Sequence, residues 1–398
     1  MVGEALPVVE VGPIAHGGHC VARLDGQVVF VRHTLPGETV RIRITEDAGR
    51  FLRADAVDVV GSAPGRVEPP CELAGTCGGC DFQHVSPERQ RELLTDVVRE
   101  QLQRLAGVTW DGHVEAVAPD LGWRTRMSWA VDDEGRPGLR RHRSHDVVPV
   151  QTCPIAHPDL PDVLSHRWQD ELVQTVISST GEQLVACDGP VPDGLSIQNV
   201  VDAVGQRRTG RPSVVERVGP HDFRVSGTGF WQIHPRAAAT LVDAVLAAAA
   251  VRRGDTVADL YAGVGLFTAF LADAVGEQGT VVSVEADPGG ARDARRNLHD
   301  RHHVRLVHDT TERALRRGAV PAADVVVLDP PRTGAKRAAK DLAALGARTI
   351  VYVACDPAAL ARDVASFERL GYRLQGVRGF ALFPMTHHVE CVATLTQP

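Results

Sequence analysis

The first 62 residues carry short runs in which apolar and polar residues alternate or valine dominates. This pattern is typical of β-strands with one buried face. Asp25-Gly26 lies between two such runs and predicts a tight hairpin. Several short strands at this spacing predict a small OB-like β-barrel over residues 1–62, with strands near 8–11, 28–31, 40–44 and 54–60.

The pattern becomes helical after Ser86. Ser86 can cap a helix, Pro87 suits the first turn, and the apolar positions that follow have helical spacing. From residue 113 to about residue 220 short strand-like runs alternate with loops, and the pattern does not predict how these strands are arranged. We assign residues 63–220 to a central α+β domain. The apolar positions of the helix are Leu94, Val97, Val98, Leu102 and Leu105.

From about residue 237 the chain alternates between strand and helix patterns. An alanine-rich segment, 237–251, predicts a helix packed on a sheet. We expect a doubly wound, Rossmann-like α/β domain over residues 221–398. Its expected strands are 256–260, 280–285, 304–307, 324–329, 349–353 and 391–395, and its further helices are 266–274, 288–300, 312–317, 336–345 and 357–370.

The composition is that of an ordinary globular protein, with 43% hydrophobic and 23% charged residues among 398. The formal net charge of −7 argues against nonspecific coating of nucleic acid, although arginines gather within 124–143 and 207–211. The chain shows no signal-peptide pattern and no apolar stretch of about 18 residues. We expect a cytoplasmic monomer without a membrane partner.

The first strand of the α/β domain ends in a glycine turn, Tyr261-Ala262-Gly263-Val264-Gly265. Such a turn lets a ligand approach the backbone. The second strand ends in Glu285, a carboxylate that suits ribose hydroxyls. The turn lacks the third glycine of a pyrophosphate-binding fingerprint and the lysine of a P-loop. An adenosyl cofactor without pyrophosphate, S-adenosylmethionine, therefore fits better.

Three reactive side chains fall at strand ends: Asp329, Cys355 and Glu390. An antiparallel last strand would begin beside the end of the fifth strand, so we expect Cys355 and Glu390 at one sheet edge. A thiolate that adds to C6 of a pyrimidine makes C5 nucleophilic toward a sulfonium methyl, and a base must then remove the C5 proton. Cys355 suits the nucleophile and Glu390 the base, while Asp329 could hold the polar edge of the ring.

These motifs, with Phe230-Trp231-Gln232 and Leu328-Asp329-Pro330-Pro331-Arg332, resemble the uridine-C5 RNA methyltransferases that form 5-methyluridine in ribosomal or transfer RNA. The N-terminal barrel resembles a TRAM domain, an OB-like RNA-binding module. The resemblance implies RNA as the partner, with rRNA favoured over tRNA and a single-stranded or loop uridine flipped into the site. It implies a cofactor site lined by Gln232, Tyr261, Gly263, Gly265, Glu285, Asp309 and Asp329, with Phe230 and Asp329 near the target base.

Three cysteines lie close together, Cys71, Cys77 and Cys80, and Cys153 follows much later. In a cytosolic chain such a group predicts a metal site rather than disulfides. The spacing suits a four-thiolate cluster, with a tetrahedral zinc site as the rival. The resemblance favours a [4Fe–4S] cluster, because some members of the family carry one with this spacing.

Two positions depart from the family pattern. Asp356 follows Cys355 where the family usually has asparagine, and Leu266 follows the glycine turn where asparagine is common. A carboxylate beside Cys355 would disfavour the thiolate unless it is compensated. Two alternatives stay open: a methyltransferase acting on an amino group held by Asp329-Pro330-Pro331, and a noncatalytic RNA-binding protein that keeps the fold.

Overall fold

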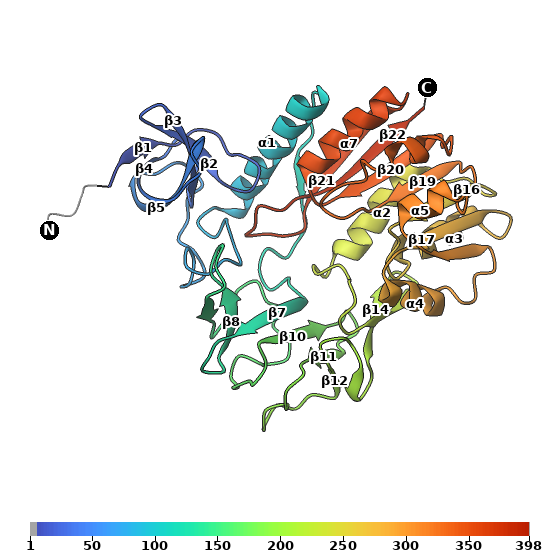
Figure 1. Ribbon diagram of the computed structural model, residues 1–398, viewed down its shortest axis with the longest axis horizontal. Coiled ribbons are helices and arrows are strands. Elements are labelled where there is room, and N and C mark those ends of the chain that lie inside the picture. Colours follow the sequence, from blue (N-terminus) through green and yellow to red (C-terminus); the bar gives the residue numbers. More distant parts are fainter. Residues whose placement is uncertain (1–5, 398) are drawn as a thin grey trace.

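The computed structural model describes residues 6–397. Residues 1–5, the start of the expected first domain, lie outside the described residues. Figure 1 shows the N-terminal strands on one side, a large sheet with its helices on the other, and a third group of strands below them. None of the helices in the described residues is both long and apolar enough to cross a membrane.

The N-terminal sheet has five strands in the order β1-β4-β5-β3-β2. They are β1 (Val8–Glu10), β2 (Cys20–Leu24), β3 (Gln27–Arg32), β4 (Thr39–Asp47) and β5 (Phe51–Gly61). The predicted hairpin at Asp25-Gly26 is confirmed, because β2 and β3 pair directly across it. Backbone hydrogen bonds from Gly12 to Val21 and from Val21 to Pro13 join the segment after β1 to β2. These bonds close the sheet into the expected small barrel.

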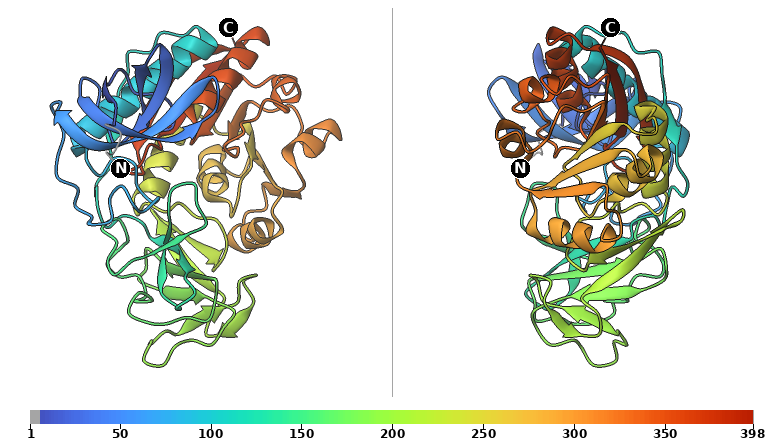
Figure 2. Two further views of the ribbon diagram at one scale, coloured as in Figure 1. Left: turned by 60° about the vertical axis from the view of Figure 1, so that its left-hand side comes forward. Right: turned by 90° about the vertical axis from the view of Figure 1, so that its right-hand side faces the viewer.

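The predicted helix after Ser86 is also confirmed, as α1 (Pro87–Ala106). The Ser86 hydroxyl accepts a hydrogen bond from the Arg89 amide at 3.3 Å, and Gly107 ends the helix in a left-handed conformation. The helix buries Leu94, Val97, Val98 and Leu102. One continuous hydrophobic cluster runs from the barrel through this face of α1 to the C-terminal sheet. Figure 1 shows α1 between the N-terminal strands and the C-terminal elements, and in Figure 2 the same helix, in cyan, lies beside both.

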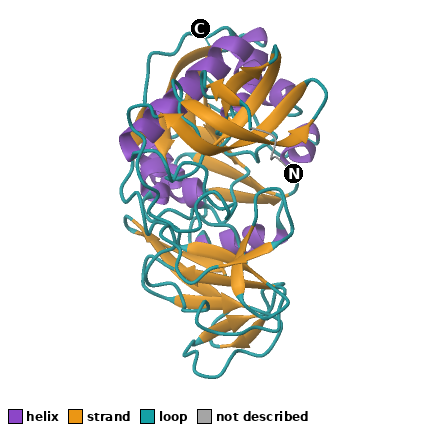
Figure 3. Ribbon diagram, turned by 90° about the vertical axis from the view of Figure 1, so that its left-hand side faces the viewer, coloured by secondary structure: helices purple, strands orange, loops and turns teal. Residues whose placement is uncertain are grey.

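The central segment, which the sequence pattern could not order, forms a seven-stranded sheet in the order β13-β12-β11-β10-β7-β8-β9. Figure 3 shows that strands and loops make up this part, while the helices gather around the C-terminal sheet. A separate hairpin, β14 (Ser213–Val218) with β15 (His221–Ser226), follows it. The seven strands are β7 (Arg126–Val131), β8 (Pro137–Arg140), β9 (Val147–Pro149), β10 (Leu172–Ile177), β11 (Gln183–Ala186), β12 (Asn199–Val201) and β13 (Arg207–Thr209).

The C-terminal sheet has eight strands in the order β18-β17-β16-β19-β20-β22-β21-β6. The five strands from β18 to β20 run parallel, and β22 is antiparallel to β20. The edge strand β6 (Val114–Ala116) comes from the segment assigned to the central domain. The others are β16 (Thr256–Leu260), β17 (Thr280–Glu285), β18 (Val304–His308), β19 (Val325–Leu328), β20 (Thr349–Ala354), β21 (Arg373–Ala381) and β22 (Glu390–Thr396).

Helices cover both faces of this sheet, as a doubly wound fold requires. Core residues of α2 (Ala237–Ala249), α3 (Leu266–Val275) and α4 (Pro288–Asn297) share one hydrophobic cluster. Those of α1, α5 (Thr311–Arg316), α6 (Ala339–Ala343) and α7 (Pro357–Arg369) share the other. The helix α6 is shorter than the helix expected over residues 336–345. Leu266 is buried at the start of α3, which explains an apolar residue at this position.

Candidate active site

Asp329, Cys355 and Glu390 lie at one edge of the eight-stranded sheet. Asp329 follows β19 and Cys355 follows β20, two neighbouring parallel strands. Ala354, the last residue of β20, lies opposite Cys391 of the antiparallel strand β22. Cys355 and Glu390 are the next residues along these two strands toward the same edge. The structure thus brings together the thiol and the carboxylate that the sequence analysis paired.

The charges of these three groups act on one another. Burial, followed by the charges of Glu390 and Asp329, raises the pKa of the Cys355 thiol to about 11. Burial and the charge of Asp329 raise the pKa of Glu390 well above its usual range. Burial and the nearby Asp259 raise the pKa of Asp329 to about 7. A buried carboxylate with a raised pKa is a stronger base when it is deprotonated.

Arg332 supplies the opposing charge, and the sequence analysis gave it no role. Its guanidinium lowers the pKa of both Cys355 and Glu390. Arg332 Nη2 lies 3.3 Å from Nε2 of His388, whose ring lies 4.1 Å from that of His387. His387 in turn lies 2.6 Å from the Asp81 carboxylate. The motif Leu328-Asp329-Pro330-Pro331-Arg332 contains Arg332, but sequence gives no sign of the contact between His387 and Asp81, which lie 306 residues apart.

The glycine turn adopts the backbone conformation that a close ligand requires. Gly263 and Gly265 have φ of 57° and 92°, and Tyr261 has φ of 61° although it carries a side chain. Such strain in a residue other than glycine is concentrated at functional sites. A Cβ at Gly263 would meet nothing within 4 Å, whereas one at Gly265 would lie 2.8 Å from Leu298. Gly263 therefore faces open space, and Gly265 is required for packing of the helix.

Glu285 is the last residue of β17, and Asp309 follows β18, the next strand of the sheet. Oε2 of Glu285 accepts a hydrogen bond from the Gly263 amide at 2.6 Å, which joins the carboxylate to the glycine turn. The Asp309 amide donates to the Glu285 carbonyl at 3.0 Å, and its carboxylate pairs with Arg317 at 3.1 Å. The predicted turn, Glu285 and Asp309 thus form one continuous row at the sheet edge.

Buried polar groups lie directly behind this turn. Asp259 of β16 is fully buried, and it accepts a hydrogen bond from the Thr268 hydroxyl through one oxygen. Its other oxygen, Oδ1, has no hydrogen-bond partner among the described residues. Burial raises the pKa of Asp259 to about 7. Sequence analysis missed this residue, because a carboxylate inside a strand gives no signal of its burial.

Gln232 and Phe230 lie in the loop between β15 and α2. Gln232 lines a cavity of about 500 Å³ between the central sheet and the start of α2, together with Trp231 and His234. Phe230 is 72% exposed in the loop between β15 and α2. An exposed aromatic ring is a suitable surface for stacking a base. The expected roles of both residues stay predictions.

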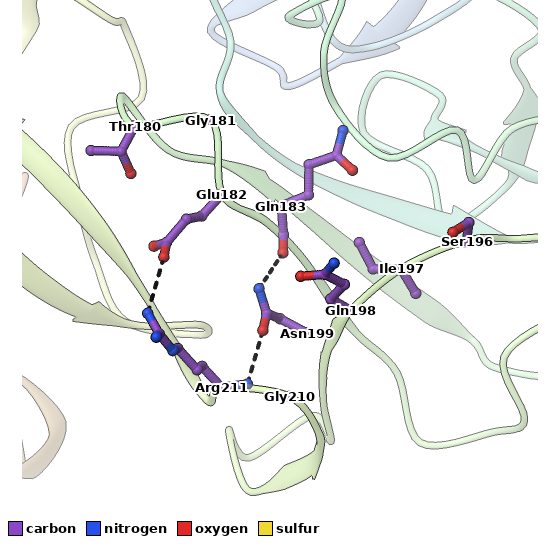
Figure 4. A pocket seen from close by; sticks show the side chains of 10 residues that line it. All are labelled: Thr180, Gly181, Glu182, Gln183, Ser196, Ile197, Gln198, Asn199, Gly210 and Arg211. Carbon is purple, nitrogen blue, oxygen red and sulfur yellow. Dashed lines mark hydrogen bonds and ion pairs between the residues drawn. The ribbon is translucent and has the colours of Figure 1, made fainter.

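A second large cavity, of about 660 Å³, lies on the central sheet and contains none of the predicted site residues. Figure 4 shows the Glu182 side chain directed toward Arg211, and the Asn199 side chain between the Gln183 and Arg211 backbones. Arg211 pairs with Glu182 at 3.5 Å, and the side-chain amide of Asn199 donates to the backbone carbonyl of Gln183 at 2.9 Å. Arg126, Arg136 and Arg143 also pair with carboxylates, so part of the positive charge of the arginine clusters is balanced within the described residues.

Cys71, Cys77, Cys80 and Cys153 all line one small cavity. Within residues 6–397, no three cysteine, histidine or acidic side chains are already arranged around a single metal ion, and these cysteines form no disulfide. The Gly79 backbone amide donates to Cys77 Sγ at 3.4 Å, and the side-chain amide of Gln83 donates to Cys80 Sγ at 3.2 Å. Four sulfurs around one cavity, with N–H donors to two of them, fit a thiolate-bound cluster.

Asp356 does not approach Cys355 as an uncompensated charge. Its Oδ1 accepts a hydrogen bond from the Ala359 amide at 2.7 Å and caps α7. Its Oδ2 lies 3.0 Å from Nε2 of His16, a residue of the N-terminal barrel. Although burial opposes the charge, these partners hold the pKa of Asp356 below its usual range.

The strand order, the glycine turn after β16 and the acidic residue at the end of β17 define a class I methyltransferase fold, to which a small barrel is attached. Residues 1–57 match the TRAM domain family, and residues 319–398 match the tRNA (Uracil-5-)-methyltransferase family. Residues 232–312 also match the protein-L-isoaspartate(D-aspartate) O-methyltransferase family.

Relatives cover nearly the whole chain. An uncharacterised RNA methyltransferase of Streptomyces coelicolor is 47% identical over 99% of this chain and 93% of that protein. The 23S rRNA (uracil(1939)-C(5))-methyltransferase RlmD of Alcanivorax borkumensis is 31% identical over 96% of this chain and 94% of its own length. The chain therefore belongs to the RNA (uracil-C5)-methyltransferase family, which confirms the resemblance seen in its motifs.

One solved structure shares the complete architecture. The tRNA (uracil-54, C5)-methyltransferase of Pyrococcus abyssi, in complex with S-adenosyl-L-homocysteine, superposes with a TM-score of 0.74. The match covers 98% of this chain and 99% of that one at 24% identity. It supports the fold, including the position of the barrel and the central strands within one arrangement.

Proposed function

We propose that this chain transfers a methyl group from S-adenosylmethionine to C5 of a uridine in RNA through a covalent adduct with Cys355. The Cys355 thiolate adds to C6, and the C5 carbon then takes the methyl group from the sulfonium, which leaves as S-adenosylhomocysteine. Glu390 removes the C5 proton, and the electron pair of that bond expels the thiolate from C6. The product is 5-methyluridine and the free thiol.

The juxtaposition of Cys355 and Glu390 across β20 and β22 supports this reaction most strongly. The nucleophile and the base must act on adjacent carbons of one ring, so they must lie within one ring's width of each other. Arg332 favours the charged forms of both groups, which the reaction uses in turn. Asp329, which lies between the glycine turn and these groups, could accept a hydrogen bond from N3–H of the uracil ring.

The row at the sheet edge supports S-adenosylmethionine as the cofactor. Gly263 leaves room for a ligand against the backbone, and the Glu285 carboxylate lies beside it, where ribose hydroxyls would bind. Tyr261 and Asp309 would complete the adenosyl site. The bound cofactor supplies the sulfonium methyl, while these residues orient it toward Cys355.

We propose rRNA rather than tRNA as the substrate. The relative whose name specifies 23S rRNA is 31% identical over 96% of this chain, whereas the tRNA enzyme is similar in fold at 24% identity. The TRAM domain at residues 1–57 would bind RNA outside the site, and the exposed Phe230 would stack on or beside the flipped base.

We further propose that the four cysteines hold a [4Fe–4S] cluster. The cavity that they share and the two amide donors to sulfur support this assignment. Anaerobically purified protein should contain about four iron and four sulfide per chain, and Cys77→Ser should lower both. Zinc without sulfide would instead establish the rival zinc site.

Tritium release tests the proposed reaction. RNA labelled with tritium at uridine C5 should release one tritium for each methyl transferred, because Glu390 removes that hydrogen. Unmodified 23S rRNA should be a better substrate than unmodified tRNA. Methyl transfer without tritium release, or transfer that survives Cys355→Ala, would instead indicate methylation of an amino group.

A further inference from the structure

A tight turn of the N-terminal barrel reaches the active-site edge of the C-terminal sheet. The Ala15 amide donates to the His19 carbonyl at 2.7 Å and the Gly18 amide to the Ala15 carbonyl at 3.2 Å. Gly17 and Gly18 have φ of 97° and 79°, which only glycine adopts readily. The turn therefore presents His16 at its tip in a fixed direction.

The turn makes two contacts with segments that carry active-site residues. Nε2 of His16 lies 3.0 Å from Oδ2 of Asp356, the residue after Cys355. A Cβ at Gly18 would lie 2.7 Å from Cβ of His387, three residues before Glu390, so the backbone of the turn lies against that segment. Both segments that supply the nucleophile and the base thus touch the same turn of the barrel.

Asp356 holds two partners at once. Oδ1 caps α7 through the Ala359 amide, and Oδ2 is left for His16. Without His16, the second oxygen of Asp356 would lose its partner in the barrel. Asparagine at this position would keep the cap and carry no charge, so it would need no such partner.

We propose that His16 is a positioning residue for Cys355: by pairing with Asp356 it fixes the nucleophile's loop against the barrel. This proposal rests on the proposed function of Cys355 as nucleophile. It assigns the barrel a part in the chemistry besides binding RNA. It also explains how this chain accommodates an aspartate directly after its nucleophile.

Other charged groups surround the same thiol and must be held constant in a test. Glu390 and Cys391 lie on β22, Asp329 and Arg332 follow β19, and Arg362 of α7 faces Asp356. A double-mutant cycle that leaves these groups untouched isolates the His16–Asp356 term. The variants are His16→Ala, Asp356→Asn and the two combined in the full-length chain.

The first readout is the rate of alkylation of Cys355 by iodoacetamide across pH, measured on its own peptide by mass spectrometry without RNA or cofactor. His16→Ala should raise the rate at pH 8 about two- to fivefold, because the loop that buries the thiol is no longer held against the barrel. Asp356→Asn should react at least as fast as the unmodified chain, and adding His16→Ala to it should change nothing. His302→Ala, at an exposed histidine before β18, is the matched control.

The second readout is methyl transfer, in which His16→Ala should lower kcat with little change in KM for RNA. Equal losses from His16→Ala in both backgrounds, or no loss in either, would overturn the proposal. A rise in KM alone would overturn it too, since that would assign His16 to RNA binding. A positive alkylation cycle in a chain that transfers no methyl would leave the contact intact and reject only the proposed function.

Discussion

Cys355 should be a slow thiol in the free protein, despite its place in the reaction. Its pKa is raised from 9.0 to about 11, and each pKa unit is a tenfold change in the thiolate fraction below the pKa. At pH 8 the thiolate should therefore be about 100-fold scarcer than for an ordinary thiol. The alkylation rate should keep rising with pH until about pH 11.

Substitution of Glu390 tests the origin of this shift. Burial is the largest cause and the Glu390 charge the next, so Glu390→Gln should recover part of the loss, about three- to tenfold at pH 8. Arg332→Gln should slow alkylation by a similar factor, because its charge favours the thiolate. The assay is iodoacetamide labelling read on the Cys355 peptide, with Asp300→Asn at an exposed site as the control for loss of one acidic charge.

The reasoning would be refuted by either of two results. One is a Cys355 that alkylates with the midpoint of an exposed thiol, since burial beside two carboxylates would then have no effect. The other is a Glu390→Gln variant that alkylates more slowly than the unmodified chain. Such a result would mean that Glu390 helps to deprotonate the thiol rather than opposing its charge.

Three further predictions concern the base, the glycine turn and the buried aspartate. Glu390→Gln should accumulate a methylated covalent RNA–protein complex, seen as a band resistant to denaturing gel electrophoresis, because the adduct cannot lose its C5 proton. Gly263→Ala should weaken S-adenosylmethionine binding, measured by calorimetry, and should lower the free energy of unfolding by about 1–2 kcal/mol, because its φ is positive. Gly265→Ala should lower it further, since its Cβ would also lie 2.8 Å from Leu298. Burial raises the pKa of Asp259 to about 7 in the folded state, so the free energy of unfolding should fall as pH rises from about 4 to 7. Asp259→Asn removes this cost, and it should therefore raise Tm more at pH 8 than at pH 5.

The elements with strong periodicity were predictable from sequence. β16 and β17 have the predicted bounds, and α1 begins after Ser86 as its cap indicated. These segments are buried on one or both faces, so their patterns record their environment. The central sheet was not predictable, because its strands are short and alternate with long loops, and β6 joins a sheet whose other strands lie more than 100 residues away.

The site residues that could be predicted from sequence are those that lie at the ends of strands. Cys355 and Glu390 were placed together because one antiparallel pairing fixes both. The contact of His16 with Asp356 depends on how the N-terminal barrel packs against the C-terminal domain, and that of Arg332 with His388 joins two loops of the C-terminal domain. Asp356 illustrates the difference: sequence alone presents it as an uncompensated charge, while its partner lies 340 residues earlier in the chain.

The most direct test of the central claim uses RNA that contains 5-fluorouridine. Fluorine at C5 cannot be removed as a proton, so the reaction should stop after methyl transfer with Cys355 still bound to C6. Incubation with S-adenosylmethionine should give a stable protein–RNA complex whose linked peptide contains Cys355, and Cys355→Ala should give none. Methyl transfer to ordinary RNA with no such complex, or a complex that persists in Cys355→Ala, would contradict the account.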